Sequence, residues 1–246
     1  MISLLISALK IIILLGFLVL IHEGGHFLFA KLFKIKVNEF AIGFGPTIFS
    51  KEKGETKYAL RLIPLGGFVN MEGEEERSNE EGSFSEASIP KRIAIVAAGG
   101  LVNILFGILL YYIISSISLN SMYIGLIDTK DFIISIFESI KLLFTGNVTM
   151  NQMTGIVGIS DIVVNTNGIL NYLYIMALIS ASLGITNLLP LPPLDGGKIV
   201  IYLIEAIRKK KMSEELELKI QSLGFSLLIA LAIIVTYNDI IRIFLV

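Results

Sequence analysis

The 246-residue sequence predicts an α-helical polytopic membrane protein with about four transmembrane helices and a membrane-associated β-hairpin after the first. Hydrophobic residues make up 54% of the chain and charged residues only 17%, whereas an average soluble domain carries about a quarter charged residues. The mean hydropathy is +0.79. A water-soluble fold would expose much of this apolar excess, so the composition argues against a soluble enzyme. The net charge of −1 gives no indication of nucleic-acid binding.

Four segments are long and apolar enough to cross a bilayer, which takes about 20 mostly apolar residues. They are residues 4–29, 93–117, 169–189 and 220–238, and we expect them to form a single domain over 1–246. The first segment is too long for a cleaved signal peptide, carries Lys10 in its middle and shows no small-residue cleavage site. We therefore expect it to be a retained span.

The loop charges predict how these spans are oriented. Lysine and arginine number ten in residues 30–92, two in residues 119–168 and six in residues 195–219. Because cytoplasmic loops of membrane proteins are enriched in basic residues, we expect the first and third loops to be cytoplasmic. The chain is then a multi-pass protein of the cell membrane with both termini outside.

The loops themselves are patterned. Residues 37–69 contain two apolar, β-prone arms around the turn Lys53-Gly54-Glu55, which predicts a β-hairpin. Such a hairpin either enters the membrane against protein or a wet cavity or lies at the surface. Residues 72–86 hold seven glutamates and predict a flexible, solvated connector. An apolar stripe within residues 130–145 predicts an outer interfacial helix.

The only two histidines of the chain lie in one motif, His22-Glu23-Gly24-Gly25-His26. On a helix, residues four apart lie on one face, so both imidazoles can bind one metal ion while Glu23 takes a proton from a metal-activated water. HExxH is the zinc-protease signature, and this composition would produce it by chance roughly once in a thousand such sequences. The alternative is a pair of packed core histidines, which is unfavourable inside a span.

A catalytic zinc usually takes three protein ligands and a water. The chain has no cysteine and no third histidine, so the third ligand is a carboxylate or, less favourably, a neutral oxygen. Asp195 follows span three at the cytoplasmic depth of the histidines, in a Pro-rich segment that ends Asp195-Gly196-Gly197. Its alternative is a plain Asp-Gly turn. Three other carboxylates are disfavoured by outer location, helix capping and hairpin location respectively: Asp239, Glu205 and Glu39.

With these motifs the sequence resembles the site-2 protease family of intramembrane metalloproteases, in its bacterial regulator-of-sigma-E protease branch. The resemblance rests on HEGGH, the hairpin elements GFGP and PLGGFV, KRIAIVAAGGLVN at the start of span two, MTGIVGIS before span three, and NLLPLPPLDGG. It implies a membrane-reentrant hairpin and a Zn²⁺ site in which Glu23 is the catalytic acid/base and His22, His26 and Asp195 are the ligands. It further implies that the substrate is held by Asn187, Pro190 and Pro192, and by Gly43 and Gly45 of the hairpin.

The implied activity is zinc-dependent hydrolysis of a peptide bond within or near the transmembrane segment of single-span proteins in a bacterial plasma membrane. Anti-sigma factors and signal-peptide remnants are the implied substrate types, and the active site faces the cytoplasmic side. The chain departs from the family in having Gly99-Gly100 where Gly-Pro is common. Residues 119–168 are also too short for a PDZ domain of roughly 80–100 residues, so we expect no PDZ filter.

Two other classes of function stay open at this stage. A metal-binding scaffold or pseudo-protease would have no use for Glu23. A metal transporter would need polar residues along other spans, and the candidates there are Asn103 and Asn187. Asn103 is equally well explained by a hydrogen bond between helices. The sequence does not indicate an oligomeric state.

Overall fold

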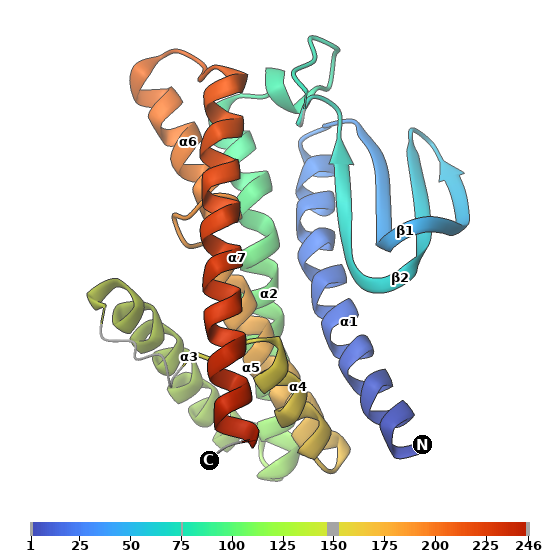
Figure 1. Ribbon diagram of the computed structural model, residues 1–246, viewed down its shortest axis with the longest axis vertical. Coiled ribbons are helices and arrows are strands. Elements are labelled where there is room, and N and C mark those ends of the chain that lie inside the picture. The colour runs from blue at the N-terminus through green and yellow to red at the C-terminus, as the bar shows by residue number, and fades with distance from the viewer. Residues whose placement is uncertain (1, 75, 147–152, 245–246) are drawn as a thin grey trace.

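The computed structural model, described for residues 2–74, 76–146 and 153–244, contains seven α-helices and one antiparallel strand pair. Among the helices, α1 (Ile2–Leu32), α2 (Ile89–Ser118), α5 (Ile169–Asn187) and α7 (Glu214–Phe244) have the length and composition to cross a membrane. Strands β1 (Val37–Lys53) and β2 (Thr56–Met71) lie beside the second half of α1, and both chain ends lie at the opposite end of the molecule (Figure 1). The predicted fold class is confirmed. The shorter helices are α3 (Met122–Thr145), α4 (Ile156–Asn165) and α6 (Asp195–Arg208).

Helix α2 is the centre of the bundle and contacts α1, α3, α5 and α6. Small residues let its backbone approach its neighbours, as is typical of helix pairs in membranes. A Cβ atom added to Gly25 of α1 would lie 2.6 Å from the Ala98 carbonyl oxygen of α2. On the other side of α2, a Cβ atom on Gly184 of α5 would lie 2.4 Å from the Gly100 carbonyl oxygen. These two close approaches fix α1 and α5 against α2.

The hairpin is bent, so that the first half of β1 has a strand neighbour on each side. Ala41 pairs with Ala59 on one side and with Phe68 on the other. The bend falls at Gly43 and Gly45, which both have φ of +85°, a conformation that costs glycine little. As a result, residues 67–71 of β2 form an outer edge, which is paired only with β1 among the described residues. Large apolar side chains at or near this bend are exposed, including Phe44, Ile48, Phe49 and Leu62.

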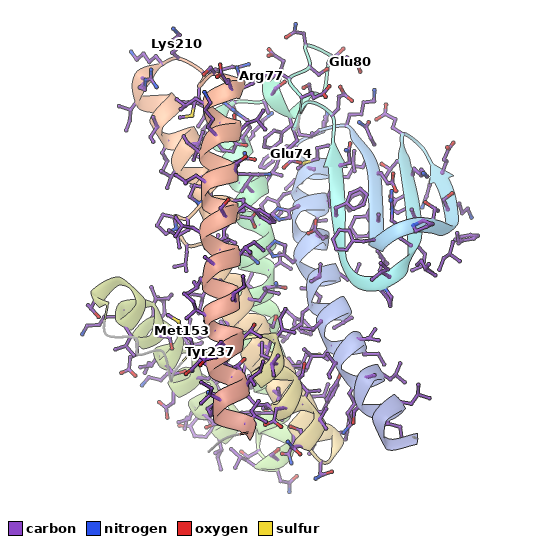
Figure 2. The ribbon with its side chains drawn as sticks, viewed as in Figure 1. Glu74, Arg77, Glu80, Met153, Lys210 and Tyr237 are labelled. Atoms are coloured by element: carbon purple, nitrogen blue, oxygen red, sulfur yellow. The ribbon has the colours of Figure 1, made fainter. Side chains whose placement is uncertain are left out.

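The expectation of a flexible, solvated connector over residues 72–86 is wrong for residues 83–85, which are buried. Phe84 is buried, with 2% of its surface exposed, and packs against Tyr202 of α6. Ser83 accepts a hydrogen bond from the Ser85 amide at the start of a short 3-10 helix, Phe84–Glu86. The connector is attached because one aromatic residue among the glutamates has an apolar site to occupy. Figure 2 shows the connector residues Arg77 and Glu80, together with Lys210, at the end of the molecule opposite Tyr237.

Helix α7 is held to the bundle near its C-terminal end by a buried carboxylate. Asp239 is fully buried and its Oδ2 accepts hydrogen bonds from the Gly155 and Gly158 amides, at 2.9 and 2.8 Å. Gly155 is the N-cap of α4 and has no side chain of its own to satisfy these donors. Arg242 donates to Oδ1 at 3.0 Å. Asp239 is therefore an interhelical cap.

We predict that Asp239→Ala lowers the free energy of unfolding by about 2 kcal/mol, because the Gly155 and Gly158 amides lose a charged acceptor. Denaturant unfolding in detergent measures this change. The matched control is Asp161→Ala, since Asp161 is exposed and its carboxylate accepts a hydrogen bond from Asn165 one turn away. Equal stability of the two variants would show that the cap contributes nothing.

Candidate active site

The two histidines lie one turn apart on α1 and face α2 and α6. Each is buried, with 8% of its surface exposed. Their rings meet edge to face with centroids 4.7 Å apart, and the two Nε2 atoms are 3.1 Å apart. An arrangement of two Nε2 atoms aimed at one point is what the HExxH spacing predicts.

Asp195 completes a triangle of ligand atoms. Its Oδ2 lies 3.1 Å from Nε2 of His22 and 3.4 Å from Nε2 of His26. Around a tetrahedral zinc with ligands at about 2.0–2.1 Å, neighbouring ligand atoms lie roughly 3.3 Å apart. The Asp195 Oδ2 atom is also buried without a hydrogen-bond partner among the described residues. The three residues therefore fit a zinc ion in both spacing and chemistry.

The local sequence around Asp195 explains its position. Helix α5 ends at Asn187, and the Pro-rich segment 188–194 folds back over the start of α6. A Cβ atom on Gly196 would lie 2.2 Å from the Leu189 carbonyl oxygen, and one on Gly197 would lie 2.6 Å from the Pro192 nitrogen. The double glycine is required for this close return of the chain. Asp195 is the first residue of α6, where the helix dipole also stabilises a carboxylate.

Gly99 of α2 keeps open the space between the two imidazoles. A Cβ atom at this position would lie 2.3 Å from Nε2 of His26 and 2.8 Å from Cε1 of His22. One turn earlier on α2, the Ile95 carbonyl oxygen is 2.9 Å from Nδ1 of His26. A carbonyl can only accept, so the proton of His26 is on Nδ1 and its Nε2 is free for a metal. Sequence reasoning missed both roles of α2.

Glu23 and the ligand triangle share one cavity of about 220 Å³. The edge segment of β2 forms one wall, and a Cβ atom on Gly67 would lie 3.6 Å from Cγ of Glu23. Glu74 accepts a hydrogen bond of 2.8 Å from Lys198 in the same cavity wall. Burial alone would lower the pKa of the Lys198 ammonium, but the Glu74 carboxylate raises that pKa above its ordinary value. The remaining lining is apolar: Phe68, Val69, Met71 and Val96.

A buried HExxH-plus-carboxylate triangle beside an open cavity is the arrangement of a metallopeptidase centre. Comparison with known proteins agrees, since the profile of peptidase family M50 matches residues 10–231. The chain belongs to peptidase family M50. The resemblance to the site-2 proteases is thereby confirmed, and as a member of this family the chain is a zinc-dependent metalloendopeptidase of the membrane.

Relatives with similar sequences cover almost the whole M50 chain. A Clostridium acetobutylicum protein provisionally named a zinc metalloprotease is 27% identical over 325 aligned positions, which cover 94% of this chain and 96% of that protein. Zinc metalloprotease RasP of Geobacillus kaustophilus is 24% identical over 421 positions, which cover 100% of each chain. Both alignments contain more positions than the 246 residues of this chain, so these relatives carry segments that it lacks.

The residues predicted to bind substrate are not among those that line the cavity of this M50 peptidase. Asn187 ends α5, and Pro190 and Pro192 belong to the segment 188–194. Gly43 and Gly45 form the bend of β1. Their substrate-binding role stays a prediction.

The carboxylates disfavoured as zinc ligands have other partners. Glu39 is bonded to Arg61 in the hairpin at 2.7 Å. Glu205 lies 3.1 Å from Arg92 and accepts from the Met212 amide at 2.7 Å. Asp239 caps α4, as described above.

We predict that Gly99→Ala weakens zinc binding about tenfold or more, because its methyl group would occupy the space between the imidazoles. Zinc per chain after purification, measured by elemental mass spectrometry, reports the loss. Gly24→Ala is the matched control in the motif itself, since nothing lies within 4 Å of a Cβ atom there. Full zinc content in Gly99→Ala would contradict this reading of the site.

Proposed function

We propose that the protein is an intramembrane endopeptidase that hydrolyses a peptide bond within or near the transmembrane segment of single-span membrane proteins. The observation that carries the proposal is the convergence of His22, His26 and Asp195 within hydrogen-bond distance of one another on helices of a membrane bundle. These residues would hold Zn²⁺, with Glu23 in the same cavity as the catalytic acid/base.

The chemistry follows from the positions of these groups. When bound, zinc supplies a Lewis acid that lowers the pKa of water and polarises the scissile carbonyl. Glu23 takes the proton of the attacking water and delivers it to the leaving amine. No serine or cysteine nucleophile is required. Lys198, held by Glu74 in the cavity wall, adds a fixed positive charge beside the site.

The outer edge of β2 supports a mode of substrate binding. A transmembrane helix has its carbonyls in hydrogen bonds, so a substrate segment must unwind before hydrolysis. Residues 67–71 offer a strand edge with no pairing partner among the described residues, and Phe68, Val69 and Met71 also line the cavity that holds Glu23. An unwound segment can add to this edge as a further strand, which would place its backbone beside the candidate ligands. Gly43, Gly45, Asn187, Pro190 and Pro192 are kept as candidate substrate contacts.

The orientation that we propose places both termini outside and the active site towards the cytoplasm of a bacterial cell membrane. Both chain ends lie at one end of the bundle, while the hairpin and α6 lie towards the other (Figure 1). The loops at the hairpin end carry ten and six basic residues, against two in residues 119–168. The exposed apolar end of the hairpin, with Phe44 and Ile48, favours entry into the membrane over a surface location.

The natural substrates that we propose are anti-sigma factors or signal-peptide remnants, in keeping with the site-2 protease resemblance. Between α2 and α5 the described chain has α3 and α4, a stretch too short for a PDZ domain. We propose that α3, with Tyr123, Leu126 and Phe137 exposed, lies at the membrane–water interface on the outer side of the cell membrane. Substrates would then be selected without a PDZ filter.

We predict that Glu23→Gln keeps its zinc and loses cleavage of a single-span membrane peptide by roughly 10²–10⁴-fold, because the general base is removed while the ligands stay. Zinc content and cleavage are measured for both proteins in liposomes, with cleavage mapped by mass spectrometry. Zinc in both proteins with no cleavage by either would favour a metal-binding scaffold. Equal cleavage by both proteins would contradict the proposed role of Glu23.

We also predict that proline at the outer edge impairs cleavage and leaves zinc bound, since proline removes a backbone donor from the strand. Phe68→Pro and Val69→Pro are made separately, because neighbouring residues in a strand direct their amides to opposite sides. The control is Lys51→Pro in residues 47–53, the opposite edge of the hairpin. Parallel loss of zinc and cleavage would indicate misfolding of the site, and unchanged cleavage would exclude strand addition at this edge.

A further inference from the structure

Asn103 of α2 is a buried polar residue that the proposed reaction does not use. It is fully buried, with 0% of its surface exposed, in the centre of a membrane helix. Its Nδ2 atom lies 3.4 Å from Nδ1 of His22. Ile95, Gly99 and Asn103 are successive residues four apart, so they form one stripe of α2 along the two imidazoles. The stripe contacts His26 through Ile95 and both rings through Gly99.

A hydrogen bond between α2 and α5 does not account for the Asn103 side chain. The polar link from α2 to α5 runs from the Ser180 hydroxyl to the backbone carbonyl of Asn103, at 2.8 Å. Any residue at position 103 would keep that carbonyl. The Asn103 Oδ1 atom is buried without a partner in the described part of the chain. His22 is thus the group that the buried amide serves.

To bind a metal through Nε2, His22 needs a hydrogen-bond acceptor for its Nδ1–H group. Its Nε2 atom is the one that points at Asp195 and His26, so binding a metal there requires the proton to be on Nδ1. His26 meets the same requirement through the Ile95 carbonyl. The nitrogen and oxygen of an asparagine amide exchange places by a half-turn about χ2, and their assignment follows from the hydrogen-bond network. A half-turn places the Asn103 Oδ1 against Nδ1–H of His22.

We propose that Asn103 is a positioning residue of the zinc site, which holds the His22 imidazole in the tautomer with Nε2 free for the metal. This inference rests on the zinc site of the proposed function. In the orientation with Nδ2 towards His22, the amide donates to Nδ1 and the proton of His22 is on Nε2, where it can donate to Asp195. The amide can therefore partner both tautomers of His22, with Oδ1 towards the ring when zinc is bound.

The test is zinc affinity, measured by competition with a chromophoric chelator in the full-length Glu23→Gln protein in detergent. We expect Asn103→Leu, which keeps the volume and removes the acceptor, to weaken zinc binding about 10–100-fold, the range found for such outer partners of metal ligands. Asn103→Asp keeps an acceptor and should bind zinc within about threefold of the parent. The visible spectrum of the Co²⁺-loaded protein should shift in Asn103→Leu and be retained in Asn103→Asp.

The matched control is Ser180→Ala, which removes the bond to the Asn103 carbonyl and leaves the amide in place. It should lower thermal stability without changing zinc affinity. Zinc binding by Asn103→Leu within twofold of the parent would overturn the proposal. So would failure of both Asn103→Leu and Asn103→Ala to fold while Ser180→Ala folds, because that result assigns Asn103 to packing. A Glu23→Gln parent without zinc would instead overturn the metal site itself.

Discussion

The constraint on which this structure depends is the cost of placing two imidazoles and a carboxylate side by side inside an apolar helix bundle. Each of these groups is mostly buried, and the three ligand atoms lie 3.1–3.4 Å apart. Burying an ionised carboxylate without a compensating partner is expensive, and more so at membrane depth. A zinc ion satisfies the carboxylate and both Nε2 atoms at once. Such a group of side chains would therefore be more favourable with a metal ion bound than as a packed core.

Helix α2 makes this convergence possible. It carries none of the three candidate zinc ligands, yet it contacts both helices that carry them, α1 and α6. Gly25 lets α1 approach the α2 backbone, and Gly99 leaves room where a metal ion would lie. The Ile95 carbonyl and the Asn103 side chain contact the Nδ1 atoms of His26 and His22 respectively. On the far side Gly100 packs against α5, whose C-terminal continuation carries Asp195. Helix α2 thus sets the distance between the candidate ligands, because it packs against α1 on one side and against α5 on the other.

Much of this arrangement could be predicted from the sequence. The membrane spans follow from composition, and the placement of both HExxH histidines on one face of a helix follows from helical periodicity alone. The lack of a cysteine and of a third histidine left a carboxylate or a neutral oxygen as the expected third ligand, and the predicted topology then favoured Asp195. The role of Gly99 could not be predicted, because it depends on how closely α1 and α2 approach. The outer edge of β2 depends on the bend at Gly43 and Gly45, which pairs β1 on two sides. The burial of Phe84 was missed because local composition, rich in glutamate, outweighed a single aromatic residue.

The most direct test of the central claim is zinc K-edge X-ray absorption of the purified wild-type protein and of Asp195→Asn. We expect the wild type to show two imidazole ligands and oxygen ligands at about 2.0–2.2 Å, with no sulfur shell near 2.3 Å. The Asp195→Asn variant should show an altered oxygen shell with both imidazoles retained. A wild-type spectrum without imidazole scattering, or one that Asp195→Asn leaves unchanged, would contradict a site formed by His22, His26 and Asp195.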